Sequence, residues 1–238
     1  EIVLESLLII SGRSKFRSKE FSLISEQVGA RALGIVALIS FLVGLILAFI
    51  SIIQLNKLGA GVYCADLVGI AMMREMGCLM AAIIMSGRTG AAFAATIGTM
   101  VVNEEIDAIK TSGLSCFRFI IIPRIFALVL MMPLLCVFAD LIGIAGGMFA
   151  ATTMLDINVT QYLTQTQSAV VLSDFLCGLI KSVFFALLVA GIGCWQGMRC
   201  GRDAEAVGQA TTAAVVESIT AIIMADAVFA VIFNALEI

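Results

Sequence analysis

Residues 32–56 have the sequence ALGIVALISFLVGLILAFISIIQLN, a run of 25 residues without a single charge. A helix needs about 20 apolar residues to cross the hydrocarbon core of a bilayer, so this run predicts a transmembrane helix with some tilt. Of the 238 residues in the chain, 61% are hydrophobic and 13% charged, whereas an ordinary soluble domain has roughly 45–50% and 25%. The composition excludes a soluble enzyme and predicts one polytopic membrane domain.

Four further apolar stretches follow, and each contains one ionisable residue. They lie between residues 75 and 104, 124 and 156, 174 and 199, and 217 and 237, and their ionisable residues are, in order, Arg88, Asp140, Lys181 and Asp226. A charged side chain at membrane depth is costly, which makes all four candidates for function. Because two are basic and two acidic, mutual neutralisation inside the bundle explains them equally well. The predicted fold is an all-α membrane protein with five transmembrane helices.

Small residues recur at four-residue spacing inside the predicted spans. Gly143 is followed by Gly147, and Gly193 by Gly197. In a lipid environment, such pairs allow helix backbones to approach closely. The pattern predicts tight packing between helices and gives no information about a substrate.

The basic residues of the connecting segments predict the orientation in the membrane. Five lie before the first span, three in the second connection and two in the fourth, whereas the opposite face has only Lys57. Lys and Arg are concentrated in cytoplasmic loops. We therefore expect the N-terminus in the cytoplasm and the C-terminus on the outer face.

The first 27 residues form a separate N-terminal segment in this interpretation, followed by the membrane domain at residues 28–238. The sequence EIVLESLLII, residues 1–10, is apolar around most of a helix and is followed by the basic run RSKFRSK. A helix lying in the cytoplasmic interface, with basic residues near anionic headgroups, fits this pattern. The alternative is a frayed or clipped additional span.

Several classes of chemistry are excluded or disfavoured by composition. The chain has no His, which removes imidazole metal ligands and histidine-assisted nucleophiles, and its seven Cys include no CxxC pair. The net charge is -3 and no basic, aromatic-interleaved segment occurs, so nucleic acid is not an expected partner. No GxxxxGK[ST] loop is present either. If transport is powered by ATP, another subunit must bind and hydrolyse it.

The second connection contains a short helical motif, VVNEEIDAIKTSGL, at residues 101–114. Asn103 is a natural N-cap and Gly113 a natural C-cap, while the acidic residues favour the N-terminal end of a helix and Lys110 the C-terminal end. Ile106 and Ile109 share one face. From periodicity alone, docking of a soluble partner on this face and packing against the chain's own bundle are equally good interpretations.

Arg74 and Glu75 form a charged pair that we place near the outer end of the second span. Adjacent helical residues point about 100° apart, so a single partner cannot satisfy both. They are candidates for a polar pocket at that end.

Several sequence blocks together resemble the MlaE/YrbE permeases, the membrane subunits of ABC transporters that work with MCE-domain proteins. The resemblance runs from about Glu26 to Phe233. Its most specific blocks are DLVGIAMMREMG (66–77), SGRTGAAFAATIGTM (86–100), NEEIDAIKTSGL (103–114), PRIFALVLMMPLL (123–135), ADLIGIAGG (139–147), GLIKSVFFALLVAGIGCWQG (178–197) and EAVGQATTAAVV (205–216). The blocks occur in the family's order.

The resemblance implies an N-terminal interfacial helix, five spans and a homodimer in the bacterial inner membrane. It also implies an outward-facing cavity that holds phospholipid below a hexameric ring of periplasmic MCE-domain subunits. Cytoplasmic ABC ATPase subunits would bind ATP and magnesium, so this chain itself is expected to hold no cofactor and no metal.

The resemblance also implies roles for individual residues. Arg74 and Glu75 match the family's Arg-Glu motif near the lipid pocket, and Lys181 matches its intramembrane Lys. The motif in the second connection matches the coupling helix that sits in a groove of the ATPase, and its residues are Asn103, Glu104, Glu105, Ile106, Asp107, Ile109 and Lys110. The chain departs from the family pattern at Cys78, Thr96, Ile97, Ser115, Cys116 and Gln209, and we assign no role to the charges and prolines missing there.

Two other functional classes remain as alternatives. An ion-coupled secondary transporter would use Asp140, Lys181 and Asp226 as a proton or ion relay. A non-transporting membrane scaffold would use its small-residue faces only to assemble other membrane proteins. An ATPase subunit and phospholipid that co-purify with the chain would support the permease over both.

Overall fold

The computed structural model describes residues 18–155 and 157–236, and nearly all of them are helical. No strand occurs within these two ranges, which agrees with the predicted all-α class. The N-terminal helix α2 (Ser18–Val28) leads through a short 3-10 turn, η1 (Ala30–Ala32), into α3 (Leu33–Asn56). The interfacial helix predicted at residues 1–10 lies outside the described residues.

Five helical segments are long and apolar enough to cross a membrane, as the sequence predicts. They are Leu23–Asn56, Gly61–Val102, Phe117–Met154, Leu172–Met198 and Ala204–Ala235. The second and fifth begin well before the positions expected from the sequence. Charged residues such as Glu75 and Glu217 lie inside these helices and do not end them.

The second segment is an alternation of α-helix and π-helical turns. Its parts are η2 (Gly61–Tyr63), α4 (Cys64–Ala71), the π turn η3 (Met72–Met76), α5 (Gly77–Met85), the π turn η4 (Ser86–Gly90) and α6 (Ala91–Val102). A π turn inserts an extra residue into the helical repeat, changes the direction of the side chains that follow, and is frequent at functional sites. Both charged motifs of this segment, Arg74 with Glu75 and Arg88, lie in its π turns.

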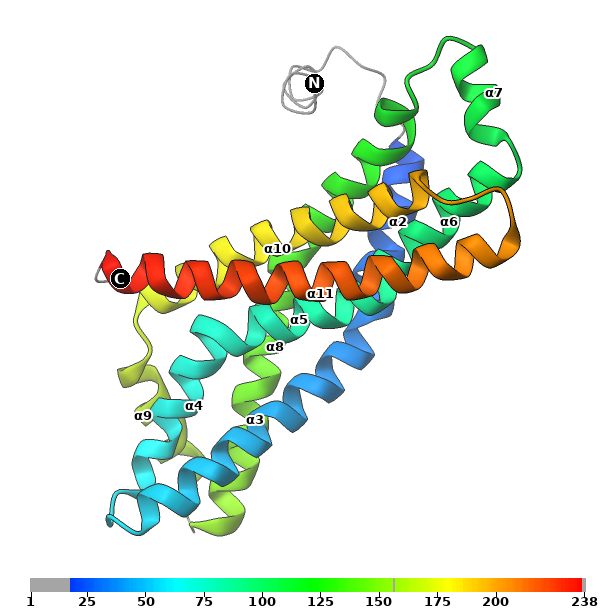
Figure 1. Cartoon of the computed structure of the whole chain (residues 1–238). Helices are drawn as coiled ribbons and strands as arrows, with labels where there is room; N and C mark the ends of the chain where they lie inside the picture. Colours follow the sequence, from blue (N-terminus) through cyan, green and yellow to red (C-terminus); the bar gives the residue numbers. More distant parts are fainter. Residues whose placement is uncertain (1–17, 156, 237–238) are drawn as a thin grey trace. The chain divides into compact units, whose positions relative to one another are not determined.

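The remaining helices follow in chain order (Figure 1). They are α7 (Glu105–Thr111), the π turn η5 (Phe117–Ile121), α8 (Ile122–Met154), α9 (Val159–Ala169), α10 (Leu172–Met198) and α11 (Ala204–Ala235). The third connection contains α9, a helix that was not among the elements predicted from the sequence. It packs against α4 (Figure 1), and its Tyr162 is buried.

The described residues divide into two compact units, which we treat one at a time. The first comprises 18–31, Met85–Met131 and Ala186–Thr220, and the second comprises Ala32–Ile84, Met132–Phe185 without residue 156, and 221–236. Glycine permits close backbone contact in each. In the second unit a Cβ added to Gly44 would lie 1.9 Å from the carbonyl oxygen of Gly143, and in the first a Cβ on Gly193 would lie 2.7 Å from that of Gly90. The predicted small-residue packing is confirmed at Gly143 and Gly193.

Candidate functional site: a buried charge cluster and a basic pocket

Lys181 is the centre of a charge cluster in the second unit. Its side chain, on α10, is fully buried. The Nζ atom donates a hydrogen bond of 2.9 Å to Oδ1 of Asp226 on α11, and it also forms an ion pair with Oε2 of Glu75 in η3. The Phe233 ring centroid lies 5.8 Å from the same Nζ. Two carboxylates and an aromatic ring thus surround one ammonium group.

Arg74, the neighbour of Glu75, has a different partner. Its Nη1 lies 3.2 Å from Oδ1 of Asp174 in the first turn of α10. Asp174 and Lys181 are seven residues apart, about two helical turns, so they lie on one face of α10. The expectation that adjacent charged residues need separate partners is confirmed. The helical segment extends further than the sequence indicates, since it begins at Gly61 and η3 lies inside it.

The pairing has a clear energetic reason. An isolated charge at membrane depth is expensive, and the cost falls when an opposite charge satisfies it. The side chains of Glu75 and Asp226 keep 28% and 19% of their surface exposed, while Lys181 has none. Lys181 is therefore the member that depends most on its partners. Mutual neutralisation, predicted for the four intramembrane ionisable residues, holds for Lys181 and Asp226.

Asp140 does not join this cluster. It is only 2% exposed, on α8, and its Oδ2 accepts a weak 3.8 Å hydrogen bond from the Cys136 thiol. Its Oδ1 has no hydrogen-bond partner among the described residues. A Cβ at Gly77 would lie 1.6 Å from that Oδ1. The absence of a side chain at Gly77 is what makes room for the carboxyl group.

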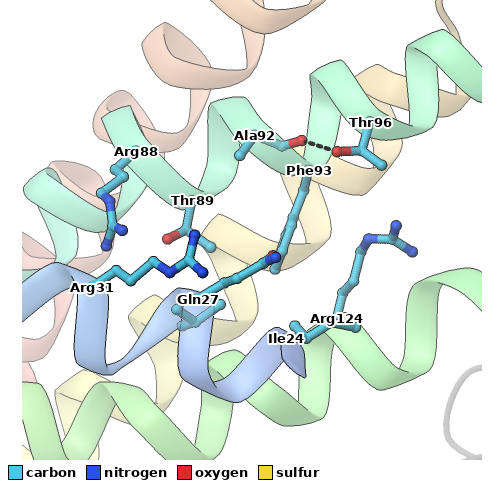
Figure 2. Close-up of a pocket in the computed structure, with 10 residues that line it drawn as sticks. Ile24, Gln27, Arg31, Arg88, Thr89, Ala92, Phe93, Thr96 and Arg124 are labelled. Carbon is cyan, nitrogen blue, oxygen red and sulfur yellow. Dashed lines mark hydrogen bonds between the residues drawn. The ribbon is translucent and has the colours of Figure 1, made fainter. Parts of the chain in front are cut away.

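Arg88 lies in the first unit, at a pocket that the sequence analysis did not predict. The pocket has a volume of about 280 Å³ and is bordered by α2, η1, η4, α6 and α8. Figure 2 shows Arg31 and Arg88 at one end of the group of lining residues and Arg124 at the other. In the sequence, Arg31 and Arg124 served only to predict orientation. They lie far apart along the chain, so no motif links them.

The predicted coupling helix is present as α7, but its start differs from the prediction. Glu104, not Asn103, occupies the N-cap position, with a left-handed φ of 60°. Asn103 instead ends α6, and its side chain donates a 3.2 Å hydrogen bond to Glu105. The left-handed conformation is uncommon for a residue with a Cβ. It separates the end of α6 from the start of α7 and places the N-cap one residue later than predicted.

The predicted C-cap at Gly113 is confirmed. Gly113 has a φ of 73°, and its N–H donates a 3.0 Å hydrogen bond to the carbonyl of Lys110. The N–H of Leu114 donates a 3.2 Å bond to the carbonyl of Ile109. These two bonds define a Schellman motif, in which glycine readily adopts the left-handed conformation.

The apolar face of α7 packs mainly against the chain itself. Ile106 is 3% exposed, its carbonyl accepts a hydrogen bond from the Cys116 thiol, and Ile109 is half-buried. The exposed residues of α7 are Glu105, Asp107, Ala108, Lys110 and Thr111. Asp107 pairs with Lys110 at 3.2 Å and with Arg202 of the fourth connection at 3.5 Å. The packing alternative of the sequence analysis thus describes Ile106, and any docking surface on α7 is polar.

Metal and disulfide chemistry finds no support in the part of the chain that the structure describes. No group of three or more Cys, Asp or Glu side chains there is arranged to hold a metal ion. All seven cysteines are free, and six of them are buried. The six buried cysteines therefore act as small packing side chains.

Comparison with known proteins identifies the family. Residues 23–232 match the family described as Permease MlaE. The chain is 36% identical to a probable ABC transporter permease protein of Rickettsia typhi over 208 residues, which cover 86% of this chain and 80% of that protein. It is 31% identical to the intermembrane phospholipid transport system permease protein MlaE of Haemophilus influenzae over 229 residues, 94% of this chain and 87% of that one.

A chloroplast protein is similar as well. The chain is 29% identical to the protein TRIGALACTOSYLDIACYLGLYCEROL 1, chloroplastic, of Arabidopsis thaliana over 227 residues, 95% of this chain and 64% of that protein. The resemblance inferred from the sequence blocks is therefore confirmed. The chain belongs to the MlaE family of ABC transporter permeases, the non-catalytic membrane subunits of these transporters.

Proposed function

We propose that this chain moves phospholipid or a related lipid between the bacterial inner membrane and a periplasmic ring of MCE-domain subunits, powered by a separate cytoplasmic ATPase. One observation carries the proposal. The match to the Haemophilus influenzae permease, whose name states intermembrane phospholipid transport, extends over 94% of this chain. Over that length the chain keeps five apolar spans and a short helix between the second and third.

The charges inside the spans support lipid as the substrate class. Arg74 and Glu75 keep part of their surface exposed, at 29% and 28%, while pairing with Asp174 and Lys181. A partly accessible Arg can meet a phosphate with two parallel charge-assisted hydrogen bonds. In this proposal the two ion pairs hold Arg74 and Glu75 in place, and Arg74 contacts the lipid phosphate.

A homodimer is part of the proposal, with α11 as a contact helix. Only 11% of the most apolar window of α11 is buried within the chain. Its exposed residues include the polar side chains Gln209, Thr212 and Glu217. A carboxylate such as Glu217 is costly against lipid tails, so a second copy of the chain that covers it would lower the cost.

Coupling to the ATPase is assigned to the exposed polar side of α7. This assignment rests on the motif at residues 103–114 and on the distribution of basic residues, which predicts a cytoplasmic position for the second and fourth connections. The ion pair between Asp107 and Arg202 joins these two connections. Since Ile106 is buried in the chain, the proposed contact involves Glu105, Ala108 and Lys110.

The test is a charge placed on exposed Ala108. Ala108→Arg should abolish co-purification of the ATPase and lipid transfer, while the permease remains folded in the membrane. Thr164→Arg, at an exposed site on α9, is the matched control and should retain both. Retention of ATPase by Ala108→Arg at the wild-type level would refute the coupling assignment.

A second measurement separates the functional classes. Lipids extracted from the purified wild-type complex are identified by mass spectrometry, and transfer to acceptor vesicles is measured with and without ATP. Retained phospholipid and ATP-dependent transfer are expected. Transport that follows an ion gradient without an ATPase would instead favour an ion-coupled transporter, in which the Glu75, Lys181 and Asp226 cluster acts as a relay.

A further inference from the structure

The basic pocket of the first unit is lined by three arginines. Three of its lining residues, Arg31, Arg88 and Arg124, carry guanidinium groups, and none of the described lining residues is acidic. The pocket volume of about 280 Å³ is well above the ~10–15 Å³ that one water molecule requires. The space can therefore hold a polyatomic anion together with water.

Two of the three arginines have recorded partners. Nη2 of Arg31 lies 3.8 Å from Oε1 of Glu26, in a pair whose side chains are both more than half exposed. Nη1 of Arg124 donates a 2.7 Å hydrogen bond to the carbonyl of Ile120, and its guanidinium lies 5.9 Å from the Phe93 ring centroid. The contacts of Arg124 fix the direction of its guanidinium group.

Arg88 is different, because its Nη1 is buried and has no hydrogen-bond partner among the described residues. A buried N–H without an acceptor loses its hydration and gains nothing in return, and the cost is larger for a charged group. Figure 2 shows Arg88 at the same end of the group of lining residues as Arg31. Arg88 thus lines the pocket with one of its donors left without an acceptor among the described residues.

The two threonine hydroxyls of the pocket are directed elsewhere. The Thr89 hydroxyl is directed to the sulfur of Met85 at 3.8 Å, and the Thr96 hydroxyl donates to the carbonyl of Ala92 at 2.8 Å (Figure 2). Apolar side chains, Ile24, Val28 and Phe93, complete the wall. The lining combines cationic and apolar side chains. It therefore suits an anion that has several oxygens and an apolar group attached better than it suits a halide ion.

We propose that this pocket binds a phosphate group, with Arg88 as its main ligand and Arg31 and Arg124 as further positive charges. One guanidinium can bind two phosphate oxygens in parallel, and a phosphate has oxygens left for a second. A carboxylate has only two oxygens and a single negative charge, so it offers fewer acceptors and less charge to several arginines. The phosphate comes either from a phospholipid headgroup or from free phosphate in solution. The proposal does not depend on the transport function proposed above.

The experiment uses the full-length permease complex and two soluble probes. Thermal unfolding is followed during titration with inorganic phosphate and, separately, with dihexanoyl-phosphatidylglycerol, each against chloride at matched ionic strength. Stabilisation by inorganic phosphate identifies free phosphate as a ligand, and stabilisation by the short-chain lipid alone identifies the headgroup. If neither probe stabilises the wild-type complex, the proposal is wrong.

Variants then locate the site. Thr96→Glu places a carboxylate at the pocket and should weaken binding of the stabilising probe about tenfold or more, as loss of one charge-assisted hydrogen bond would. Thr99→Glu is the matched control, since Thr99 is exposed on the same helix and does not line the pocket. It should bind as the wild type does.

Arg88→Gln should weaken binding to the same extent as Thr96→Glu. If Arg88→Gln does not fold, the comparison of Thr96→Glu with Thr99→Glu decides alone. Equal binding by Thr96→Glu and the wild type, or equal losses in Thr96→Glu and Thr99→Glu, would overturn the proposal, because the effect would then come from overall charge or from another site.

Discussion

Lys181 in the second unit and Arg88 in the first are both basic residues inside long apolar helices, yet their surroundings differ. Lys181 is fully buried and contacts two carboxylates. Arg88 lies at a pocket without an acidic lining residue and has a buried Nη1 without a partner among the described residues. In the sequence, both residues look alike, since each is a single cation in an apolar stretch. The three-dimensional partners separate the two.

The comparison separates a cation that is paired with carboxylates of the protein from a cation that lines a pocket and can bind an anion there. In the second unit, the Lys181 charge is used within the protein, so its removal should be felt first as lost stability. In the first unit, Arg88 has no acidic neighbour among the described residues that line its pocket, so its removal should be felt first in the binding of an anion. Mutations at the two positions should therefore affect different measurements.

The largest expected effect comes from Lys181→Met. This change leaves Glu75 and Asp226 without their cation inside the span. Removal of one partner from a buried ion pair typically costs 3–5 kcal/mol, so we expect the thermal unfolding temperature of the detergent-solubilised protein to fall strongly. Arg88→Met should lower it far less.

The neutral triple variant Lys181→Met, Glu75→Gln, Asp226→Asn sharpens this test. Replacement of a whole buried ion pair by groups without charge is often close to neutral for stability. The triple variant should therefore recover most of the stability lost in Lys181→Met. A single variant as stable as the wild type would show that Lys181 is not held by its carboxylates.

A smaller effect is expected from Gly77→Ala in the second unit. The added methyl would lie 1.6 Å from Oδ1 of Asp140, and overpacking of this kind typically costs 1–3 kcal/mol. Gly87→Ala in the first unit is the control, because a Cβ there meets no atom within 4 Å. It should be neutral or slightly stabilising, since Ala is favoured over Gly by roughly 0.5–1 kcal/mol within a helix.

The outcome of combining changes would confirm the cause. Asp140→Ala removes the atom that the Gly77→Ala methyl meets, so the double variant should be more stable than the sum of the two single effects predicts. Additive losses, measured by thermal unfolding, would mean that the two residues do not share this contact.

Much of the fold follows from the sequence alone. Uncharged stretches such as residues 32–56 predict spans because the bilayer demands about 20 apolar residues, and Gly113 predicts a helix end because glycine adopts positive φ easily. The starts of the second and fifth spans were missed for one reason. A charge was treated as the boundary of an apolar segment, although Asp66 and Arg74 bond to Gln165 and Asp174 inside the fold.

The sites were less predictable. The sequence identified Arg88, Asp140, Lys181 and Asp226 as unusual, since each is a lone charge in an apolar stretch, but it could not pair them. Partner choice depends on which helix faces meet, and a π turn such as η3 changes those faces without a clear sequence signal. The pocket around Arg88 was missed because Arg31 and Arg124 carry no motif and come to line one pocket only in three dimensions.

The smallest effect on stability, and the most informative about function, is expected from Arg74→Lys. Arg74 belongs to the second unit, but its side chain is 29% exposed, so it combines an internal partner with access from outside. Lysine keeps the positive charge opposite Asp174 and loses the two parallel hydrogen bonds that arginine can offer a phosphate. For a partly exposed pair, the change in stability should stay within about 1 kcal/mol.

Asp174→Asn provides the matched variant, because it removes the carboxylate and leaves Arg74 intact. If Arg74 contacts lipid, Arg74→Lys should reduce retained phospholipid and lipid transfer several-fold at a nearly wild-type unfolding temperature. Asp174→Asn should show the opposite pattern, with a clearly lower unfolding temperature and lipid transfer close to that of the wild type. If Arg74 only braces the helices, stability and transfer should fall together in both variants. Unchanged phospholipid content and normal transfer in Arg74→Lys would remove this residue from the proposed lipid site and place it with Lys181 among charges satisfied within the protein.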